Sequence, residues 1–370
     1  MLRAAFVGAC PFPVPQGSQV YLAESARTLQ SCGHDVRLIT YGHGLGPDPD
    51  DLRVVRCPRV PGDSFTKAGP AAAKLWLDPL LALTIRSTLR REAVEVVFAH
   101  NYEGLIASLA GAIGLHTPVI YMPHNALADE LPYYFGGAGW SAAAGRWMDR
   151  TFPRRAQAVA APHERLADYL IGLGCDPKRT AVIPPPVDAA PFLEPELRGD
   201  APSVLYLGNL DAYQNLPLLE EALQQVRAQR PETPLHVLTH AAAATLPGAE
   251  VIRLGSFADL PAALARDAVV AVPRVSWSGF PMKELNAMAA GLPVVACQSA
   301  AGTVRDGIDG LLVPDGDARA FAGALCRLLD DSALRERMGR SARERARTLH
   351  SHAVVGHKLE ALALQTLEAD

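Results

Sequence analysis

The sequence lacks the features that mark several classes of protein. Its six cysteines are scattered and form no C-x-x-C pair, which argues against a disulfide framework or a zinc site. No apolar run is long enough and free enough of charge to span a bilayer. The net charge of −4 shows no basic excess, so we expect no nucleic-acid partner. Together these absences favour a cytoplasmic globular protein with reduced thiols.

Common catalytic motifs are also missing. The chain contains no H-E-x-x-H, no G-x-S-x-G and no Walker loop. The segment Asp48-Pro49-Asp50 lies in a polar loop, where we expect it to be solvated rather than to bind a metal. A second short acidic segment, Asp315-Gly316-Asp317, is typical of a turn followed by a helix cap. The residues therefore offer no set of metal ligands.

The hydrophobic pattern indicates two α/β domains. Apolar strand-like runs alternate with amphipathic helical stretches along the chain, as in parallel sheets. The run Pro184-Pro185-Pro186 excludes helix and central strand, so it marks a domain junction. We predict two Rossmann-like domains, 1–186 and 187–370, facing across a cleft, and an Arg-rich, solvated helical tail from Asp317. The expected strands are 4–9, 35–40, 94–100, 117–124 and 158–162, then 203–210, 235–240, 249–255, 267–274 and 293–298.

The segment WSGFPMKELNAMAAGLPVVA (277–296) is the most informative part of the chain. Gly279 allows a ligand to approach the backbone closely. Pro281 suits the first position of a helix, so that Met282-Lys283-Glu284 would form a first turn whose free N–H groups bind a phosphate. Asn286 would follow on the same face as Lys283. The alternative is an ordinary strand–turn–helix unit with an empty helix terminus and a solvated Lys283.

This segment resembles the signature loop of glycosyltransferase family 4, a retaining family with the GT-B fold. The resemblance implies transfer of a sugar from a nucleotide-sugar donor, with retention and without an enzymic nucleophile, metal or cofactor. It also implies that the last helix crosses back to the first domain. Further segments match the family in order: PFPVPQGSQVYLAESARTLQSCGHDV, VVFAHNYEG, VIYMPHN, LADYLIGLGCDPKRTAVIPPPVD, VLYLGNLDAYQNLPLLEEAL and DGLLVPDGDARAFAGALCRLLDD.

The chain departs from this family where the donor binds. The family usually has two glutamates in the loop, on the sugar and the ribose, where this chain has Ser278 and Asn286. It usually has an Arg and a Lys on the diphosphate, where this chain has Asn209 and Gln214. All four changes remove charge and keep hydrogen-bonding ability. Lys283 and Arg274 are the nearest cations in sequence that could replace the lost ones.

The resemblance assigns roles to individual residues of this chain. His124, at a strand end, matches the family's cleft histidine, whereas His100 is a weaker candidate and His163 replaces a small hydroxyl residue without an evident role. We therefore predict catalytic roles for His124, Lys283 and Ser278. We predict donor binding by Gly17, Ser18, Asn125, Asn209, Gln214, Arg274, Gly279, Phe280, Pro281, Met282 and Asn286.

The acceptor is less defined by the sequence, and we expect a small molecule, a glycan or a lipid-linked compound. Two stretches combine basic and aromatic residues and could lie on an anionic membrane, although solvated Arg faces with a buried Trp would look the same. They contain Lys67, Lys74 and Trp76, and Trp140, Arg146, Trp147, Arg150, Phe152, Arg154 and Arg155.

Two other functions remain open from the sequence. The lost charges are also expected of a catalytically degenerate protein that keeps the fold for binding. A GT-B enzyme of another reaction, such as a sugar-nucleotide epimerase, would share the same segments.

Overall fold

The computed structural model describes residues 1–14, 16–60, 71–137, 139–195, 198–240 and 246–369. The chain forms two compact units. The first contains Met1–Val14, Ser18–Pro186 and His352–Asp370, and the second contains Pro15–Gly17 and Val187–Ser351. The chain passes from one unit to the other directly after its three consecutive prolines.

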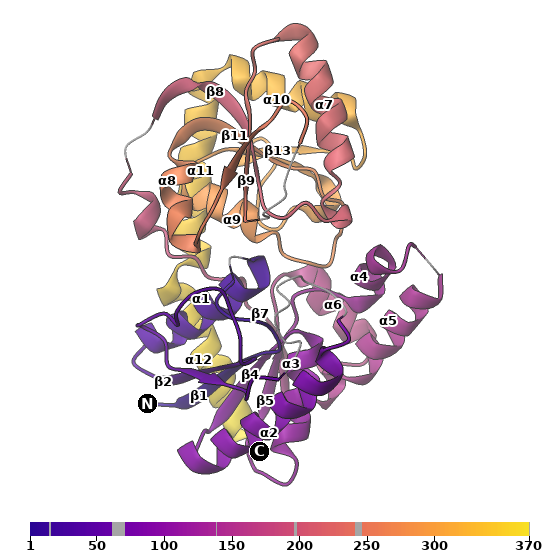
Figure 1. The fold of residues 1–370 in the computed structure, drawn as a ribbon, viewed down its shortest axis with the longest axis vertical. Helices are drawn as coiled ribbons and strands as arrows, with labels where there is room; N and C mark the ends of the chain where they lie inside the picture. The colour runs from indigo at the N-terminus through magenta and orange to yellow at the C-terminus, as the bar shows by residue number, and fades with distance from the viewer. Residues whose placement is uncertain (15, 61–70, 138, 196–197, 241–245, 370) are drawn as a thin grey trace. The chain divides into compact units, whose positions relative to one another are not determined.

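The first unit is built on a seven-stranded sheet in which every paired strand is parallel (Figure 1). Its strands are mostly buried Val, Ala, Ile and Phe, because helices cover both faces of such a sheet. In spatial order they are β3 (Val54–Arg56), β2 (Asp35–Thr40), β1 (Arg3–Gly8), β4 (Val96–His100), β5 (Val119–Met122), β6 (Ala158–Ala161) and β7 (Thr180–Val182).

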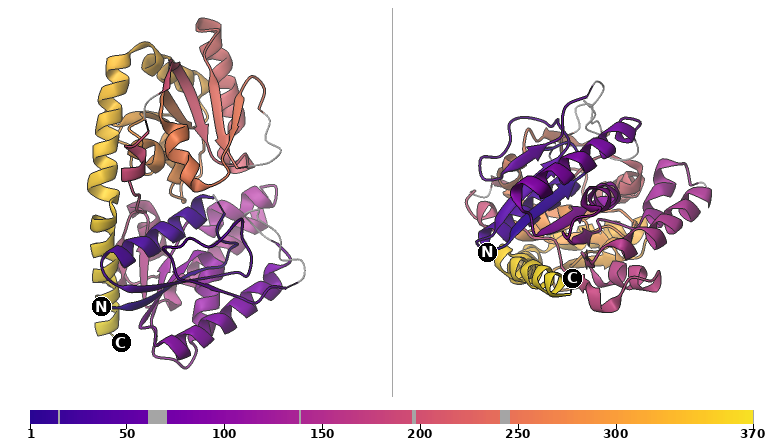
Figure 2. Two further views of the ribbon diagram at one scale, coloured as in Figure 1. Left: turned by 60° about the vertical axis from the view of Figure 1, so that its left-hand side comes forward. Right: turned by 90° about the horizontal axis from the view of Figure 1, so that it is seen from below.

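Seven α-helices belong to the described part of the first unit: α1 (Gly17–Ser31), α2 (Lys74–Glu92), α3 (Asn101–Ala112), α4 (Leu127–Tyr134), α5 (Gly139–Thr151), α6 (Glu164–Gly172) and α12 (His352–Glu368). The last of these packs beside α1 (Figure 2). A Cβ on Gly356 would lie 3.2 Å from the Thr28 carbonyl oxygen, and His352 lies 2.9 Å from Glu24. The sequence analysis did not predict α2 or β3.

The second unit repeats the arrangement with six parallel strands. Their spatial order is β10 (Glu250–Arg253), β9 (Leu235–Thr239), β8 (Arg198–Leu207), β11 (Arg266–Val272), β12 (Val294–Cys297) and β13 (Gly310–Val313). The flanking helices are α7 (Leu216–Gln229), α8 (Leu260–Leu264), α9 (Met282–Ala289), α10 (Ala318–Asp330) and α11 (Ser332–His350). Leucine and valine side chains from α7, α10 and the strands form one core.

The Arg-rich tail differs in part from the prediction. Arg335 is only 6% exposed and pairs with Asp267, while its Nη1 donates to the carbonyl oxygens of Leu328 and Leu329. The solvated face predicted for this residue is therefore wrong, because the side chain ties α11 to the end of α10. The predicted helix cap at Asp317 is confirmed, since its carboxylate accepts from the Ala320 N–H at 2.8 Å.

Two further predictions concern thiols and membrane spans. All six cysteines are free thiols, as expected. Among the helices of the described ranges, none combines the length and apolar character needed to cross a bilayer.

His163, for which the sequence suggested no role, caps α6. Its Nδ1 accepts from the Leu166 N–H at 3.2 Å, which is the task a small hydroxyl residue performs at a helix start.

We expect His163→Ala to lower the free energy of unfolding by about 1 kcal/mol, because it removes this cap. His163→Ser should retain most of the stability, since serine caps helices well. Urea unfolding of the two variants measures the difference. Equal stability of the Ala and Ser variants would contradict the capping role.

Candidate functional site

Asn209 and Arg274 lie where the second sheet reverses its winding. The strands β8 and β11 are neighbours, and the chain winds outward from them in opposite directions. Gly208 and Asn209 directly follow β8, and Arg274 lies two residues after β11. In parallel α/β sheets, ligands bind beyond the carboxyl ends of the strands at such a reversal. The predicted diphosphate-binding residues therefore occupy the expected edge.

Lys283 reaches this edge from the first turn of α9. Its Nζ donates to Gln214 Oε1 at 2.6 Å and to the Tyr206 hydroxyl at 3.1 Å, and lies 4.3 Å from the centre of the Tyr206 ring. A Cβ on Gly208 would come within 3.0 Å of the same Nζ, so glycine leaves the space that the ammonium occupies. Lys283 is only 9% exposed. The alternative of a solvated Lys283 is wrong.

Two of the predicted uncharged replacements join this group through hydrogen bonds. Gln214 Nε2 donates to Asn209 Oδ1 at 2.7 Å, and Asn209 Nδ2 donates to the Tyr213 hydroxyl at 3.0 Å. Asn209, Gln214 and Lys283 thus form one continuous set of hydrogen bonds, although they come from three separate stretches of sequence.

Arg274 adds a second buried cation. Its side chain is 8% exposed, its Cζ lies 5.7 Å from the centre of the Tyr213 ring, and its Nε has no hydrogen-bond partner in the described residues. Within those residues, neither Arg274 nor Lys283 forms an ion pair with a carboxylate. Burial first, and then the charge of Arg274, hold the pKa of Lys283 well below its ordinary value. The lowered pKa favours the neutral amine of Lys283, and a bound anion would shift it back to the ammonium. A buried arginine and a buried lysine that form no ion pair with a carboxylate of the described residues therefore make a site suited to an anion.

The start of α9 differs in detail from the prediction. Pro281 is the residue before the helix, not its first helical residue, with φ −79° and ψ 90°. The N–H of Glu284 already donates to the Pro281 carbonyl at 2.8 Å and is not free for a ligand. Met282-Lys283-Glu284 do form the first turn, as predicted, and every residue of α9 is buried.

The other predicted residues of this loop have distinct environments. Ser278 is fully buried and Gly279 is buried, while the Phe280 ring packs 5.6 Å from the His350 ring. Asn286 is 5% exposed, and its Oδ1 accepts no hydrogen bond from the described residues. Asn286 therefore holds an unused acceptor, whereas the roles of Ser278 and Gly279 stay predictions.

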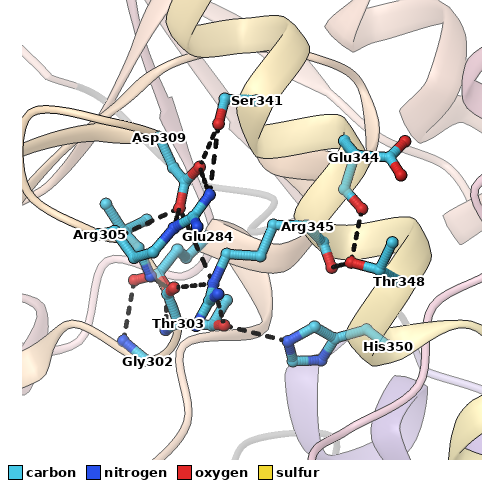
Figure 3. Close-up of polar contacts among 11 residues, drawn as sticks. Glu284, Gly302, Thr303, Arg305, Asp309, Ser341, Glu344, Arg345, Thr348 and His350 are labelled. Carbon is cyan, nitrogen blue, oxygen red and sulfur yellow. Dashed lines mark hydrogen bonds and ion pairs between the residues drawn. The ribbon is translucent and has the colours of Figure 1, made fainter.

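Glu284 fixes the start of α9 to the loop after β12 (Figure 3). Its carboxylate is fully buried and accepts from the N–H groups of Gly302, Thr303 and Val304 at 3.0, 2.6 and 3.1 Å. Burial raises the pKa of Glu284, and these three N–H groups oppose that rise. From α11, Arg345 Nε donates to the Thr303 carbonyl at 2.6 Å. This network holds in place the helix that carries Lys283.

In the first unit, His100 and His124 form a hydrogen-bonded pair. His100 ends β4 and His124 lies two residues after β5, with 2.8 Å between His100 Nδ1 and His124 Nε2. The Tyr21 ring of α1 contacts both imidazoles, at centroid distances of 5.3 and 4.8 Å. Burial lowers the pKa of His124 to about 3, and burial together with His124 holds the pKa of His100 well below its ordinary value. Both rings are therefore neutral near neutral pH.

The remaining predicted residues of the first part of the chain have other environments. The Asn125 amide donates to the carboxylate of Glu130, which also accepts from the Tyr134 hydroxyl at 3.2 Å. Gly17 and Ser18 are exposed at the start of α1. Their proposed contact with a phosphate stays a prediction.

Sequence reasoning missed Tyr206, Glu284 and Tyr21. Tyr206 lies in an apolar strand and reads as core, and Glu284 in a first helical turn reads as an ordinary charge that favours the helix dipole. Tyr206 contacts Lys283, 77 residues away, and Glu284 contacts N–H groups 18 to 20 residues away. No local pattern in the sequence reveals such contacts. In the described residues, no group of three or more His, Cys, Asp or Glu side chains is placed to hold a metal ion.

Both units match glycosyltransferase family models. A model described as a glycosyl transferase 4-like domain matches residues 16–186, and one described as glycosyl transferases group 1 matches residues 201–331. The chain is 26% identical to a D-inositol 3-phosphate glycosyltransferase of Nocardioides sp. (strain ATCC BAA-499 / JS614). That match covers 90% of this chain and 81% of the relative.

Solved structures show the same architecture. Sucrose-phosphate synthase from Thermosynechococcus elongatus has a TM-score of 0.81 at 18% identity, covering 100% of both chains. Anabaena Alr3699/HepE, in complex with UDP and glucose, has a TM-score of 0.73 at 16% identity, again covering 100% of both chains. The prediction of two Rossmann-like domains of the GT-B type is confirmed.

The Glu130 carboxyl gives a pH-dependent contribution to stability. Burial, followed by the charge of Glu103, raises its pKa from 4.5 to about 7. The native state therefore favours the protonated form, so stability is full below about pH 4.5 and is lost as the pH rises through about 7. We expect wild type to lose up to about 3 kcal/mol across this range relative to Glu130→Gln, an upper limit because Glu130 is partly exposed.

Urea unfolding at pH 5 and pH 8 measures this difference. Exposed Glu368 on α12 provides the control, since Glu368→Gln should follow wild type at both values. An unchanged gap between wild type and Glu130→Gln at the two pH values would contradict the raised pKa.

Proposed function

Because the chain belongs to family 4 of the GT-B glycosyltransferases, we propose that it transfers a sugar from a nucleotide-sugar donor to a hydroxyl acceptor with retention of configuration. The UDP and glucose bound by the similar Alr3699/HepE support a donor of this class. In this proposal the cations of the chain, rather than a resident metal or cofactor, meet the charge of the diphosphate.

The observation that carries the proposal is the pair of buried cations, Lys283 and Arg274, that lack carboxylate partners in the described part of the chain. A unit cation about 4 Å from a phosphate contributes about 4 kcal/mol at an effective dielectric of about 20. The departing nucleoside diphosphate gains negative charge as the bond to the sugar breaks. Cations already fixed at that edge stabilise this charge without having to reorganise.

The position of Lys283 also accounts for the departures from the family. The resemblance assigns a diphosphate-binding lysine to the position of Gln214, and Lys283 Nζ lies 2.6 Å from Gln214 Oε1. The side chain of Lys283, on α9, thus places its ammonium where the family's lysine would come from the loop after β8. Asn286, with its unused Oδ1, can accept a hydrogen bond from a donor hydroxyl in place of the usual glutamate.

In the proposed reaction, the electron pair of the bond between the anomeric carbon and the diphosphate leaves with the nucleoside diphosphate. The acceptor oxygen forms the new bond to the anomeric carbon on the same face. Its proton passes to the departing diphosphate oxygen. Lys283 and Arg274 hold that oxygen's phosphate, and His124 lies among the residues that we assign to the sugar.

We expect Lys283→Met to weaken nucleoside diphosphate binding about 10- to 100-fold, since a hydrogen bond to a charged group contributes about 1.5–3 kcal/mol. Isothermal calorimetry with UDP, GDP and ADP measures the loss. The variant should unfold at a temperature no lower than wild type, because a buried ammonium without an ionic partner is itself unfavourable. The double variant Gln214→Lys, Lys283→Met should regain binding by restoring the ammonium from the other side.

The exposed Lys358 on α12 supplies the control, since Lys358→Met should bind like wild type. Wild-type affinity in Lys283→Met would show that the ammonium does not contact the diphosphate. Failure of wild type to bind any of the three nucleotides would contradict the donor class itself. Nuclear magnetic resonance of the product reports the anomeric configuration, and inversion would contradict retention.

We also propose that α5 contacts an anionic membrane, which would present a lipid-linked acceptor to the first unit. Trp140 and Trp147 are 61% and 62% exposed on this helix, where Arg146 and Arg150 are exposed too. Exposed aromatic side chains bordered by cations suit the interface of an anionic bilayer. The other basic stretch fits less well, because Lys74 is already paired with Glu103 at 2.6 Å and Lys67 lies outside the described residues.

Sedimentation with phosphatidylglycerol vesicles tests this contact. We expect Trp140→Ala, Trp147→Ala to lower binding at least about tenfold, since burial of an apolar side chain contributes about 1.5–3 kcal/mol. Trp76→Ala, which removes an equally exposed tryptophan from α2, should bind like wild type. Equal binding to neutral phosphatidylcholine vesicles would show that the arginines play no part.

A further inference from the structure

The contact between His100 and His124 limits which ring nitrogens can carry a proton. Both imidazoles are neutral, because burial lowers the pKa of each. Each ring therefore carries one N–H, and one ring donates to the other across the 2.8 Å between His100 Nδ1 and His124 Nε2. Two arrangements satisfy this contact, and they give His124 opposite chemical properties.

In the first arrangement His100 Nδ1 donates, so its Nε2 is a bare lone pair and the His124 proton lies on Nδ1. In the second, His124 Nε2 donates, so His100 must carry its proton on Nε2. His100 is 1% exposed, and its Nε2 has no hydrogen-bond partner in the described residues. The second arrangement thus buries an N–H without an acceptor, and buried N–H groups without partners are rarer than buried acceptors without donors.

We infer that His100 is a positioning residue that donates from Nδ1 to His124 Nε2 and so holds the His124 proton on Nδ1. The His124 ring is partly exposed, and Nδ1 is its remaining nitrogen, so this N–H is the group that can meet a ligand. His124 then offers a hydrogen-bond donor and no free lone pair. The surrounding contacts agree with a fixed orientation, since the two rings are perpendicular at 5.1 Å and Tyr21 packs against both.

The consequence for catalysis rests on the proposed function. A donor at this position can stabilise an oxygen of the sugar or the departing group, but it cannot remove the proton from the acceptor hydroxyl. This excludes His124 as a general base. It fits the proposed step, in which that proton passes to the diphosphate oxygen.

The test uses nitrogen-15 resonances of the histidine rings in the full chain near neutral pH, without ligand, because protonated and bare ring nitrogens differ widely in chemical shift. We expect a protonated Nδ1 and a bare Nε2 in His124. A protonated Nε2 in His124 would overturn the inference, whatever the activity of the enzyme. Since the resting protein is measured, absence of sugar transfer would contradict the proposed function without affecting this result.

Two variants test whether His100 sets the tautomer. In His100→Asn the amide Nδ2 takes the place of Nδ1 and can donate, so the His124 proton should stay on Nδ1. In His100→Leu the donor is lost, and His124 should shift towards protonated Nε2. The kcat/KM of His100→Leu should fall about 10- to 100-fold below that of His100→Asn, while calorimetry should show unchanged nucleoside diphosphate binding. An unchanged His124 tautomer in the Leu variant would show that His100 does not set it.

Discussion

The second unit buries two basic side chains that form no ion pair with a carboxylate of the described residues. Lys283 and Arg274 lie at the edge where the winding of the sheet reverses between β8 and β11, against tyrosine rings and amide groups. The nearest acids, Asp211 and Glu284, have other hydrogen-bond partners, Asn209 and the N–H groups of 302–304. A buried charge is tolerated only with compensation, and hydrogen bonds to Gln214 and Tyr206 supply part of it. In the proposed function a bound diphosphate supplies the rest, so the requirements for folding and for binding meet at the same atoms.

In the proposed function, this arrangement explains how a donor site can keep its positive charge after losing the usual Arg and Lys. The ammonium of Lys283 comes from a helix that is buried on all sides, and Glu284 in the same turn holds the loop 302–304 by three N–H groups. Two adjacent residues thus have different roles. Lys283 lies at the edge of the sheet beyond β8, and Glu284 joins the helix to the loop after β12. A charge on a rigid helix is held more firmly than one on a loop, because its backbone cannot relax away.

The sequence predicted the fold well, and the roles that it assigned to site residues stay predictions. Alternating apolar runs identified ten strands to within a few residues, since buried parallel strands have a strong local signal. Short β3, with only partly buried residues, has none, and the mostly buried β13 was not predicted despite its apolar run. Asn209 and Gln214 were proposed as site residues through the resemblance, and Lys283 and Arg274 as the nearest cations in sequence. Their contacts were not predicted, because these depend on how distant strands align. His163 is a second example: it caps α6 through the position of its Nδ1, and the residue type alone does not predict that hydrogen bond.

The path of the chain has a consequence for biosynthesis. Helix α12 packs on α1 in the first unit, although the whole second unit precedes it in the sequence. During translation the first sheet must therefore wait, with the surface of α1 around Thr28 and Cys32 uncovered, until all six strands of the second sheet have been made. The two units therefore cannot fold completely one after the other, and the first unit is the last to be completed.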